Sequence, residues 1–217
     1  MEITYIGHSC FKIKGKTLSI VIDPYDPKIG YKLPKLSADV VLVTHDHFDH
    51  NNLSAVSDSR LVIDGPGEYE IGGAFVYGRS VYHDEKQGAE RGKNTMYLIT
   101  IDGIDILHVG DLGHELSQED IEKIPNVDIL MVPVGGKVTI GAEKASELIS
   151  VFEPAYVLPM HYKTLDFSGG FELDGVDKFL DEMGVENGIK KGLDKLTISS
   201  VKEDSEGTEV VVLKPTH

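Results

Sequence analysis

Residues 40–50 read Val40-Val41-Leu42-Val43-Thr44-His45-Asp46-His47-Phe48-Asp49-His50. The apolar, β-branched half extends back to Asp39 and is typical of a strand buried on both faces. The polar half begins where that strand ends, a place where a rigid scaffold presents functional groups. Alternate residues of an extended segment face the same side, so His45 and His47 can converge on one metal ion. Asp49 and His50, beyond the turn, can reach a second ion. The alternative is a charged, solvated loop.

Three further metal-ligand candidates each follow a predicted strand. They are His83 after residues 74–82, Asp111 after residues 104–109 and His161 after residues 155–160. Each has an ordinary explanation when taken alone, as a hydrogen-bonded strand-end histidine or, for Asp111, a turn residue after Gly110. Their shared position supports a common role, because a zinc-like ion takes four to six nitrogen, oxygen or sulfur donors.

The rest of the chain predicts two similar β-rich halves. Each half contains a hairpin whose second strand ends in an aspartate, Asp23 or Asp111, followed by a buried strand. This repeat predicts a sandwich of two mixed sheets with helices outside. The stretch 65–73 is glycine-rich and predicts a connection with a turn at 65–68. Further strands are expected at 2–7, 11–14, 18–22, 60–64, 96–101, 128–132, 196–199 and 209–213, and helices after Ser117, at 142–152 and at 175–183.

Whole-chain properties limit the class of protein. A length of 217 residues fits one domain over 1–217. The single cysteine, Cys10, cannot form an internal disulfide, the start lacks a signal-peptide pattern, and the apolar runs are too short to span a bilayer. We therefore expect a cytoplasmic protein. A net charge of −15 promotes solubility and repels nucleic acid and anionic membranes, although a metal-loaded cleft could still accept an anionic substrate.

With these motifs in place, the sequence resembles the metallo-β-lactamase superfamily nearly from end to end. That family has a four-layer αββα sandwich and five strand-end motifs: an Asp, the run HxHxDH, a His, an Asp and a His. The matching positions here are Asp23 in Val21-Ile22-Asp23-Pro24, residues 45–50, His83, Asp111 in His108-Val109-Gly110-Asp111, and His161 in Pro159-Met160-His161-Tyr162. Gly7-His8-Ser9-Cys10-Phe11 and His161-Tyr162-Lys163-Thr164 resemble the branch of small metal-dependent hydrolases that includes ascorbate-6-phosphate lactonase.

The resemblance implies two divalent metal ions, Zn foremost, with Mn, Fe, Ni or Co as alternatives. It assigns His45, His47 and His83 to the first ion, Asp49, His50 and His161 to the second, Asp111 as the bridge and Asp23 as a residue that orients a ligand. Among these, His83 competes with its neighbours His108 and His114. Asp49 would accept or orient the proton of the attacking water. His8 would act as a proton donor or substrate contact, or simply pack, and Lys163 would bind phosphate or remain solvated.

The implied activity is hydrolysis of an ester, lactone or phosphodiester of a small molecule by a hydroxide that bridges the two ions. The expected partner is a small-molecule substrate, without nucleic acid or membrane, and a homo-oligomer is left open. One alternative is a nuclease, disfavoured because only about fifty residues separate Asp111 from His161, too few for an inserted domain. Another is an exported β-lactamase, disfavoured by the missing signal. The third is a non-catalytic metal-binding protein, which the loss of a ligand would favour, but every expected position is filled.

Overall fold

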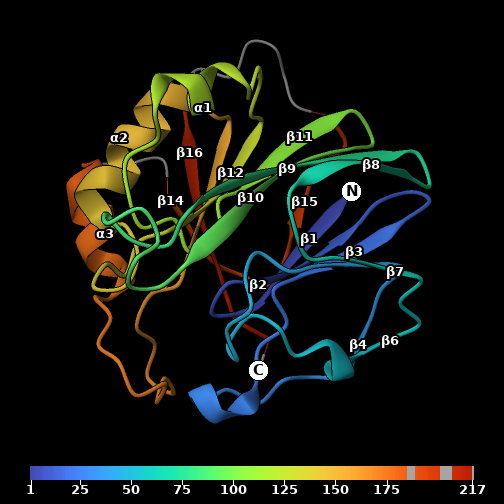
Figure 1. The fold of residues 1–217 in the computed structure, drawn as a ribbon, viewed down its shortest axis with the longest axis horizontal. Helices are drawn as coiled ribbons and strands as arrows, with labels where there is room; N and C mark the ends of the chain where they lie inside the picture. The colour runs from blue at the N-terminus through green and yellow to red at the C-terminus, as the bar shows by residue number, and fades with distance from the viewer. Residues whose placement is uncertain (185–188, 201–206, 217) are drawn as a thin grey trace.

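The computed structural model describes residues 1–184, 189–200 and 207–216. Two large mixed sheets dominate it (Figure 1). The first has six strands in the order β15 (Leu196–Thr197), β1 (Glu2–Gly7), β2 (Cys10–Lys14), β3 (Ser19–Ile22), β5 (Val40–Leu42) and β7 (Leu61–Ile63). The second has eight in the order β14 (Ile189–Leu193), β16 (Glu209–Leu213), β13 (Tyr156–Met160), β12 (Ile129–Pro133), β11 (Ile104–His108), β10 (Lys93–Ile101), β9 (Ala74–Tyr82) and β8 (Gly67–Ile71).

The two sheets pack through the alternation of side chains along their strands. Ile20 and Ile22 belong to the main core, whereas Val21 between them belongs to a second cluster on the opposite face. β5 alternates in the same way, with Val40 and Leu42 on one side and Val41 on the other, and it lies between β3 and β7. The predicted strand buried on both faces is therefore confirmed, and each such side chain contributes about 1.5–3 kcal/mol on burial.

The outer layers differ on the two sides of the sandwich. The helices α2 (Ala142–Phe152) and α3 (Val176–Met183) pack together beside the eight-stranded sheet, with the short α1 (Gln118–Glu122) near them (Figure 1). Among the described residues, the connections of the six-stranded sheet instead form two 3-10 turns and a two-stranded sheet. These are η1 (Pro27–Ile29), η2 (Leu53–Ala55), β4 (Leu36–Ser37) and β6 (Val56–Ser57).

The predicted sandwich of two mixed sheets is confirmed, while the helices lie on one side of it. Prolines in the connection between β3 and β4 explain part of this asymmetry, because proline interrupts an α-helix beyond its first turn. The helix expected after Ser117 is confirmed: Ser117 caps α1 and forms the reciprocal bonds of a capping box with Asp120. No helix in the described part of the chain is both long and apolar enough to cross a membrane.

One local prediction was wrong. Residues 67–71, expected as part of a glycine-rich connection, form the edge strand β8, which pairs antiparallel with β9. Gly72 and Gly73 both have positive φ angles and make the turn between these strands. β9 supplies the hydrogen-bonding partner that makes this polar, glycine-flanked segment a strand. The strand β14 was also not predicted from the sequence. It pairs parallel with β16.

Strand direction brings the predicted metal-ligand candidates to one end of the sandwich. β3 and β5 are parallel neighbours, so Asp23 and the residues after Thr44 leave the first sheet at the same edge. β11, β12 and β13 are also parallel, which brings Asp111 and His161 to one edge of the second sheet. β9 runs in the direction of β11, because each is antiparallel to β10, and His83 follows at that edge too.

Candidate metal centre

The loop after β5 turns tightly and carries the four ligand-type side chains of the HxHxDH motif. The amide of His47 donates to the carbonyl of His45 at 3.1 Å, and the amide of His50 donates to that of His47 at 2.9 Å. His45, Asp49 and His50 are buried, whereas Phe48 between them is 51% exposed. The turn therefore separates ligand-type side chains, which face inward, from an apolar side chain that faces solvent.

The first group of ligand-type atoms consists of His45, His47 and His83. One nitrogen of each ring lies within 4.8 Å of the other two. His83 follows β9, and its ring centre is 4.8 Å from that of His45 and 5.1 Å from that of His47. These three rings, from two sheets, converge on a space suited to one ion.

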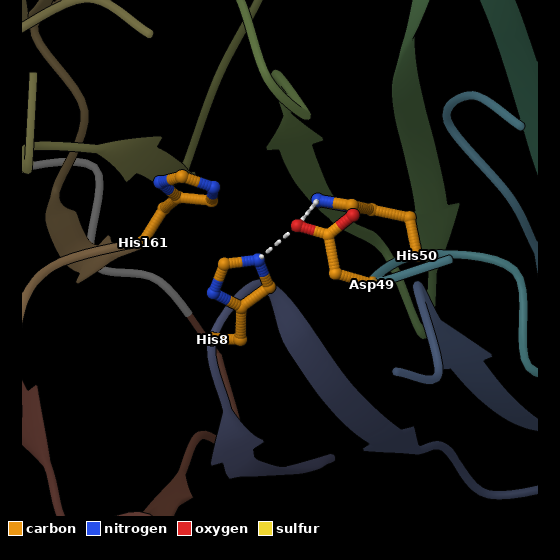
Figure 2. A group of neighbouring side chains, drawn as sticks. All are labelled: His8, Asp49, His50 and His161. Carbon is orange, nitrogen blue, oxygen red and sulfur yellow. Dashed lines mark hydrogen bonds and ion pairs between the residues drawn. The ribbon is translucent and has the colours of Figure 1, made fainter. Parts of the chain in front are cut away.

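The second group consists of Asp49, His50 and His161, joined by His8 (Figure 2). The His8 ring comes from the corner between β1 and β2 and points toward the Asp49 carboxylate, with Nε2 at 3.1 Å from Oδ2. The His161 ring lies beside the His8 ring, with the two ring centres 4.2 Å apart. All four residues are at least 94% buried.

Asp111 lies between these two groups. Its Oδ2 atom is 3.3 Å from Nε2 of His50, 3.4 Å from Nε2 of His83 and 3.1 Å from Nε2 of His161. One carboxylate oxygen therefore approaches nitrogens that belong to both groups. This is the arrangement expected of a carboxylate shared by two neighbouring cations.

The hydrogen bonding of the buried His45 and His50 rings shows whether these residues fit metal ions. Nδ1 of His45 lies 2.9 Å from the Thr44 hydroxyl, and Nδ1 of His50 lies 2.9 Å from Asp23. Within the described chain, Nε2 of both rings is buried without a hydrogen bond, and the Nε2 atom of His50 faces Oδ2 of Asp111 at 3.3 Å. A histidine anchored through one nitrogen with the other free is the usual form of a metal ligand. The donor set of nitrogen and carboxylate oxygen suits Zn and related divalent ions.

Asp23 holds the HxHxDH loop through contacts with Thr44 and His50. Its carboxylate accepts from the Thr44 amide and the Thr44 hydroxyl, both at 2.8 Å, and contacts Nδ1 of His50. Asp23 and His50 are both fully buried. The three contacts link the end of β3 to the end of β5 and hold the His50 ring in one orientation.

Burial and neighbouring charge determine the protonation of the second group. Burial, with the nearby His161, lowers the pKa of His8 to about 4, against the effect of Asp49. His8 is therefore neutral near pH 7, and its Nε2–H group donates a hydrogen bond to Oδ2 of Asp49. Burial raises the pKa of Asp49, but the hydrogen bond from His8 and the charge of His50 outweigh it and hold this pKa below its ordinary value.

The competing histidines have other contacts. Nε2 of His108 is 3.0 Å from the Ser9 carbonyl, and its Nδ1 accepts from the Gly110 amide at 3.1 Å. Nε2 of His114 accepts from the Tyr82 amide at 3.1 Å. Neither belongs to the metal-ligand groups found among the described residues, whereas His83 does. The Lys163 side chain is exposed.

Sequence reasoning missed Asn94, which fixes the loop carrying Asp111. Its side-chain nitrogen donates to the Val109 carbonyl at 2.8 Å, and its Oδ1 accepts from the Asp111 amide at 3.1 Å. Gly110, at φ +57°, has no room for a side chain, since a Cβ atom would lie 2.3 Å from Oδ1 of Asn94. The Gly110-Asp111 pair at the strand end is a signal that the sequence offers for this loop. Its partner Asn94 lies sixteen residues before Gly110, so no local pattern connects them.

Asp84 supports the loop that follows His83. Its carboxylate accepts from four backbone amides, those of Lys86, Gly88, Glu90 and Arg91, at 2.7–3.0 Å. Burial raises the pKa of Asp84, but these four bonds lower it to about 2. Residues 84–91 are therefore a loop wrapped around one carboxylate, and their position beside His83 depends on it.

Comparison with known proteins adds independent findings. The model of the beta-lactamase superfamily domain matches residues 2–161. A UPF0173 metal-dependent hydrolase of Thermoplasma volcanium is 30% identical over 193 residues, covering 76% of this chain and 85% of that protein. A UPF0173 protein of Pyrococcus abyssi is 30% identical over 208 residues, covering 85% and 93%. A crystal structure from Thermotoga maritima, described as a candidate Zn-dependent hydrolase of the metallo-β-lactamase superfamily, is 34% identical with a TM-score of 0.79, covering 98% and 97%.

Proposed function

The chain belongs to the beta-lactamase superfamily and, within it, to the UPF0173 family, and on this premise we propose that it is a metal-dependent hydrolase that uses two divalent ions. The observation that carries the proposal is the position of Asp111. Its Oδ2 atom lies 3.1–3.4 Å from nitrogens of both ligand groups. A single ion would not require a carboxylate between two sets of histidines.

In this proposal each ion has three ligands of its own, and the seventh ligand is common to both ions. His45, His47 and His83 hold the first ion, Asp49, His50 and His161 hold the second, and Asp111 bridges them. The ions are most simply Zn, while Mn, Fe, Ni and Co suit the same nitrogen and oxygen donors. When bound, such a pair lowers the pKa of a shared water toward neutrality and stabilises developing negative charge.

The side chains of the second group would handle the proton. Asp49 is buried and ionised, so it can accept the proton of the attacking water or orient that proton. His8 donates a hydrogen bond to Oδ2 of Asp49 and so fixes the carboxylate in place. Because His8 is neutral near pH 7, it adds no positive charge beside the ligands. Asp23 holds His50 in the orientation that leaves Nε2 toward the second ion.

The proposed substrate is an ester, lactone or phosphodiester of a small molecule. The resemblance to the branch that includes ascorbate-6-phosphate lactonase supports this range. The net charge of −15 disfavours a nuclease, since nucleic acid would be repelled. A non-catalytic metal-binding protein is the remaining alternative, and it is distinguished by whether the loaded protein turns over any substrate.

The experiment that tests this function begins with metal. The purified chain is stripped, reconstituted with zinc and analysed for metal by elemental analysis, then screened against esters, lactones, phosphodiesters and β-lactams. We expect two ions per chain and hydrolysis in at least one class, with Asp111→Asn holding fewer ions. A ceiling of one ion in folded protein contradicts the two-ion centre. A fully loaded protein without activity supports the non-catalytic alternative.

A further inference from the structure

The loop between β13 and α3 covers one side of the metal centre with two phenylalanines. The Ser168 amide donates to the Ile29 carbonyl at 2.8 Å, and the Thr164 hydroxyl donates to the Tyr31 hydroxyl at 2.7 Å. In Figure 1 the loop, drawn in orange, runs beside the blue helix η1. These bonds anchor the loop, and with it Phe167, to a segment more than 130 residues earlier in the chain.

The phenylalanine rings lie against two histidines of the second group, His8 and His161. Phe167 is nearly parallel to His8, with an interplanar angle of 14° and ring centres 6.1 Å apart. Phe171 is nearly parallel to His161, at 17° and 6.0 Å. The two phenylalanines meet edge to face with centres 5.1 Å apart. Both are half-buried, so each ring contacts the site and still offers surface to a ligand.

Two exposed apolar side chains lie in the ligand loop and in the loop of the pair, and the ion pairs of the ligands contain no lysine or arginine among the described residues. Phe48, next to Asp49, and Leu165, on the same loop as the pair, are both exposed. The ion pairs that the described residues give to the ligands and His8 join histidine to aspartate only. No arginine or lysine takes part in them.

We propose that Phe167 and Phe171 determine specificity by binding a planar apolar group of the substrate beside the second metal ion. The preferred substrates then carry an aromatic ring near the bond that is cleaved. This inference rests on the proposed function, since it names the substrate class of the same centre. Ring stacking on the edge-to-face pair supplies the recognition, because offset and edge-to-face aromatic contacts are favourable.

Binding of carboxylates tests this preference without requiring turnover. Phenylacetate and acetate share the carboxylate that would reach the metal ions and differ in the ring. Calorimetric titration of the zinc-loaded full chain should give phenylacetate about 10- to 100-fold tighter binding than acetate, the discrimination typical of an apolar contact surface. The double variant Phe167→Ala/Phe171→Ala should reduce this ratio to about threefold or less while keeping two zinc ions by elemental analysis.

Two matched variants make the test robust to misfolding. The chain contains no tryptophan, so Phe171→Trp keeps an aromatic ring and introduces a single tryptophan whose emission can be excited selectively. Its emission should change on adding phenylacetate, with the binding ratio retained. Phe75→Ala removes a phenylalanine that is 53% exposed on β9 and lines a groove away from the ligands. That control should behave as the unmodified chain.

The outcomes separate this inference from the proposed function. Equal or unmeasurable binding of the two carboxylates overturns the inference, as does a preference that survives in the double alanine variant. If the zinc-loaded protein hydrolyses no substrate but prefers phenylacetate through these rings, the inference stands and the proposed function fails. Hydrolysis without the preference gives the reverse conclusion.

Discussion

Single side chains in this molecule bring together parts of the chain that are distant in sequence. Oδ2 of Asp111 approaches three histidines contributed by three other segments of the chain. Burial raises the pKa of Asp111, but the neighbouring histidines His161 and His50 outweigh it and hold this pKa well below the ordinary value. The negative charge at the centre is therefore already present in the folded chain, ready to balance divalent cations.

Asp49 is the residue whose replacement separates catalysis from metal binding. Asp49→Asn keeps the size of the side chain but removes its charge and its capacity to accept a proton. We expect turnover of a substrate found in the screen to fall by about 10²–10⁴-fold. The first ion should remain, because its proposed ligands do not include Asp49. Metal content and kcat are measured on the same sample, and full turnover with unchanged KM would place the proton acceptor elsewhere.

The two histidines near the end of β9 give a paired test of the first metal site. His83→Ala should lower zinc content by about one ion per chain, because His83 shares a ligand group with His45 and His47. His114→Ala should leave zinc content unchanged, since His114 accepts a bond from the Tyr82 amide and lies outside that group. Elemental analysis of both variants decides the matter. Loss of zinc only in the His114 variant would mean that His114, and not His83, is the ligand of the first ion.

At the level of elements, the functional loops are fastened from several sides. The amide of His161 donates to the carbonyl of His8 at 2.8 Å, joining the end of β13 to the corner between β1 and β2. Both histidines have positive φ angles, 56° for His8 and 52° for His161, which non-glycine residues seldom adopt. Such strained positions persist where the surrounding contacts determine them, and here they direct both rings into one site.

The loop after β9 supplies a prediction with a pH dependence. Asp84→Asn removes the charge and leaves only one oxygen to accept from the four amides, so the loop beside His83 should loosen. We expect zinc affinity at the first site to fall by about tenfold, the lower range for residues that orient ligands. Competition with a coloured chelator measures this affinity. Asp58→Asn is the control, because the Asp58 carboxylate accepts hydrogen bonds from the hydroxyls of Ser37 and Ser57 and belongs to none of the ligand groups among the described residues.

The sign of the pH effect follows from the lowered pKa of Asp84. The carboxyl has a pKa of about 2 in the folded protein and about 3.9 when unfolded. Its stabilising contribution is therefore complete above about pH 5 and is lost as pH falls through 4 to 2. Urea midpoints of the metal-free proteins should differ by a constant amount from about pH 5 to 8 and converge as pH falls to about 2. A difference that grows on acidification would contradict this assignment.

At the scale of the whole molecule, the metal centre joins the two sheets. The proposed ligands come from loops of both: residues 45–50 follow the first sheet, while His83, Asp111 and His161 follow strands of the second. An ion bound to such a set requires the sheets to be assembled. Metal binding is then linked to folding, because the unfolded chain does not present the same set of donors.

This linkage predicts a higher melting temperature for the loaded protein. An ion that binds only the folded state, at a free concentration of 100 times its Kd, stabilises by about 2.7 kcal/mol. For a chain of this size that corresponds to about 5–10 °C for one site. Differential scanning calorimetry with and without zinc measures the shift, with His47→Ala as a variant of reduced binding. An unchanged Tm at saturating zinc would mean that the ions do not bind across the fold as proposed.

The sequence by itself determined the buried strand, the strand-end positions of the ligand candidates and the two-sheet sandwich. These features depend on local periodicity and on residues adjacent to strands, so they are visible within short windows. Only the tertiary structure decided that Asn94 holds the Asp111 loop, that residues 67–71 pair with β9, and that Phe167 and Phe171 lie on His8 and His161. Those contacts join residues that no repeating pattern in the sequence links. Only the packing of the folded chain brings them together.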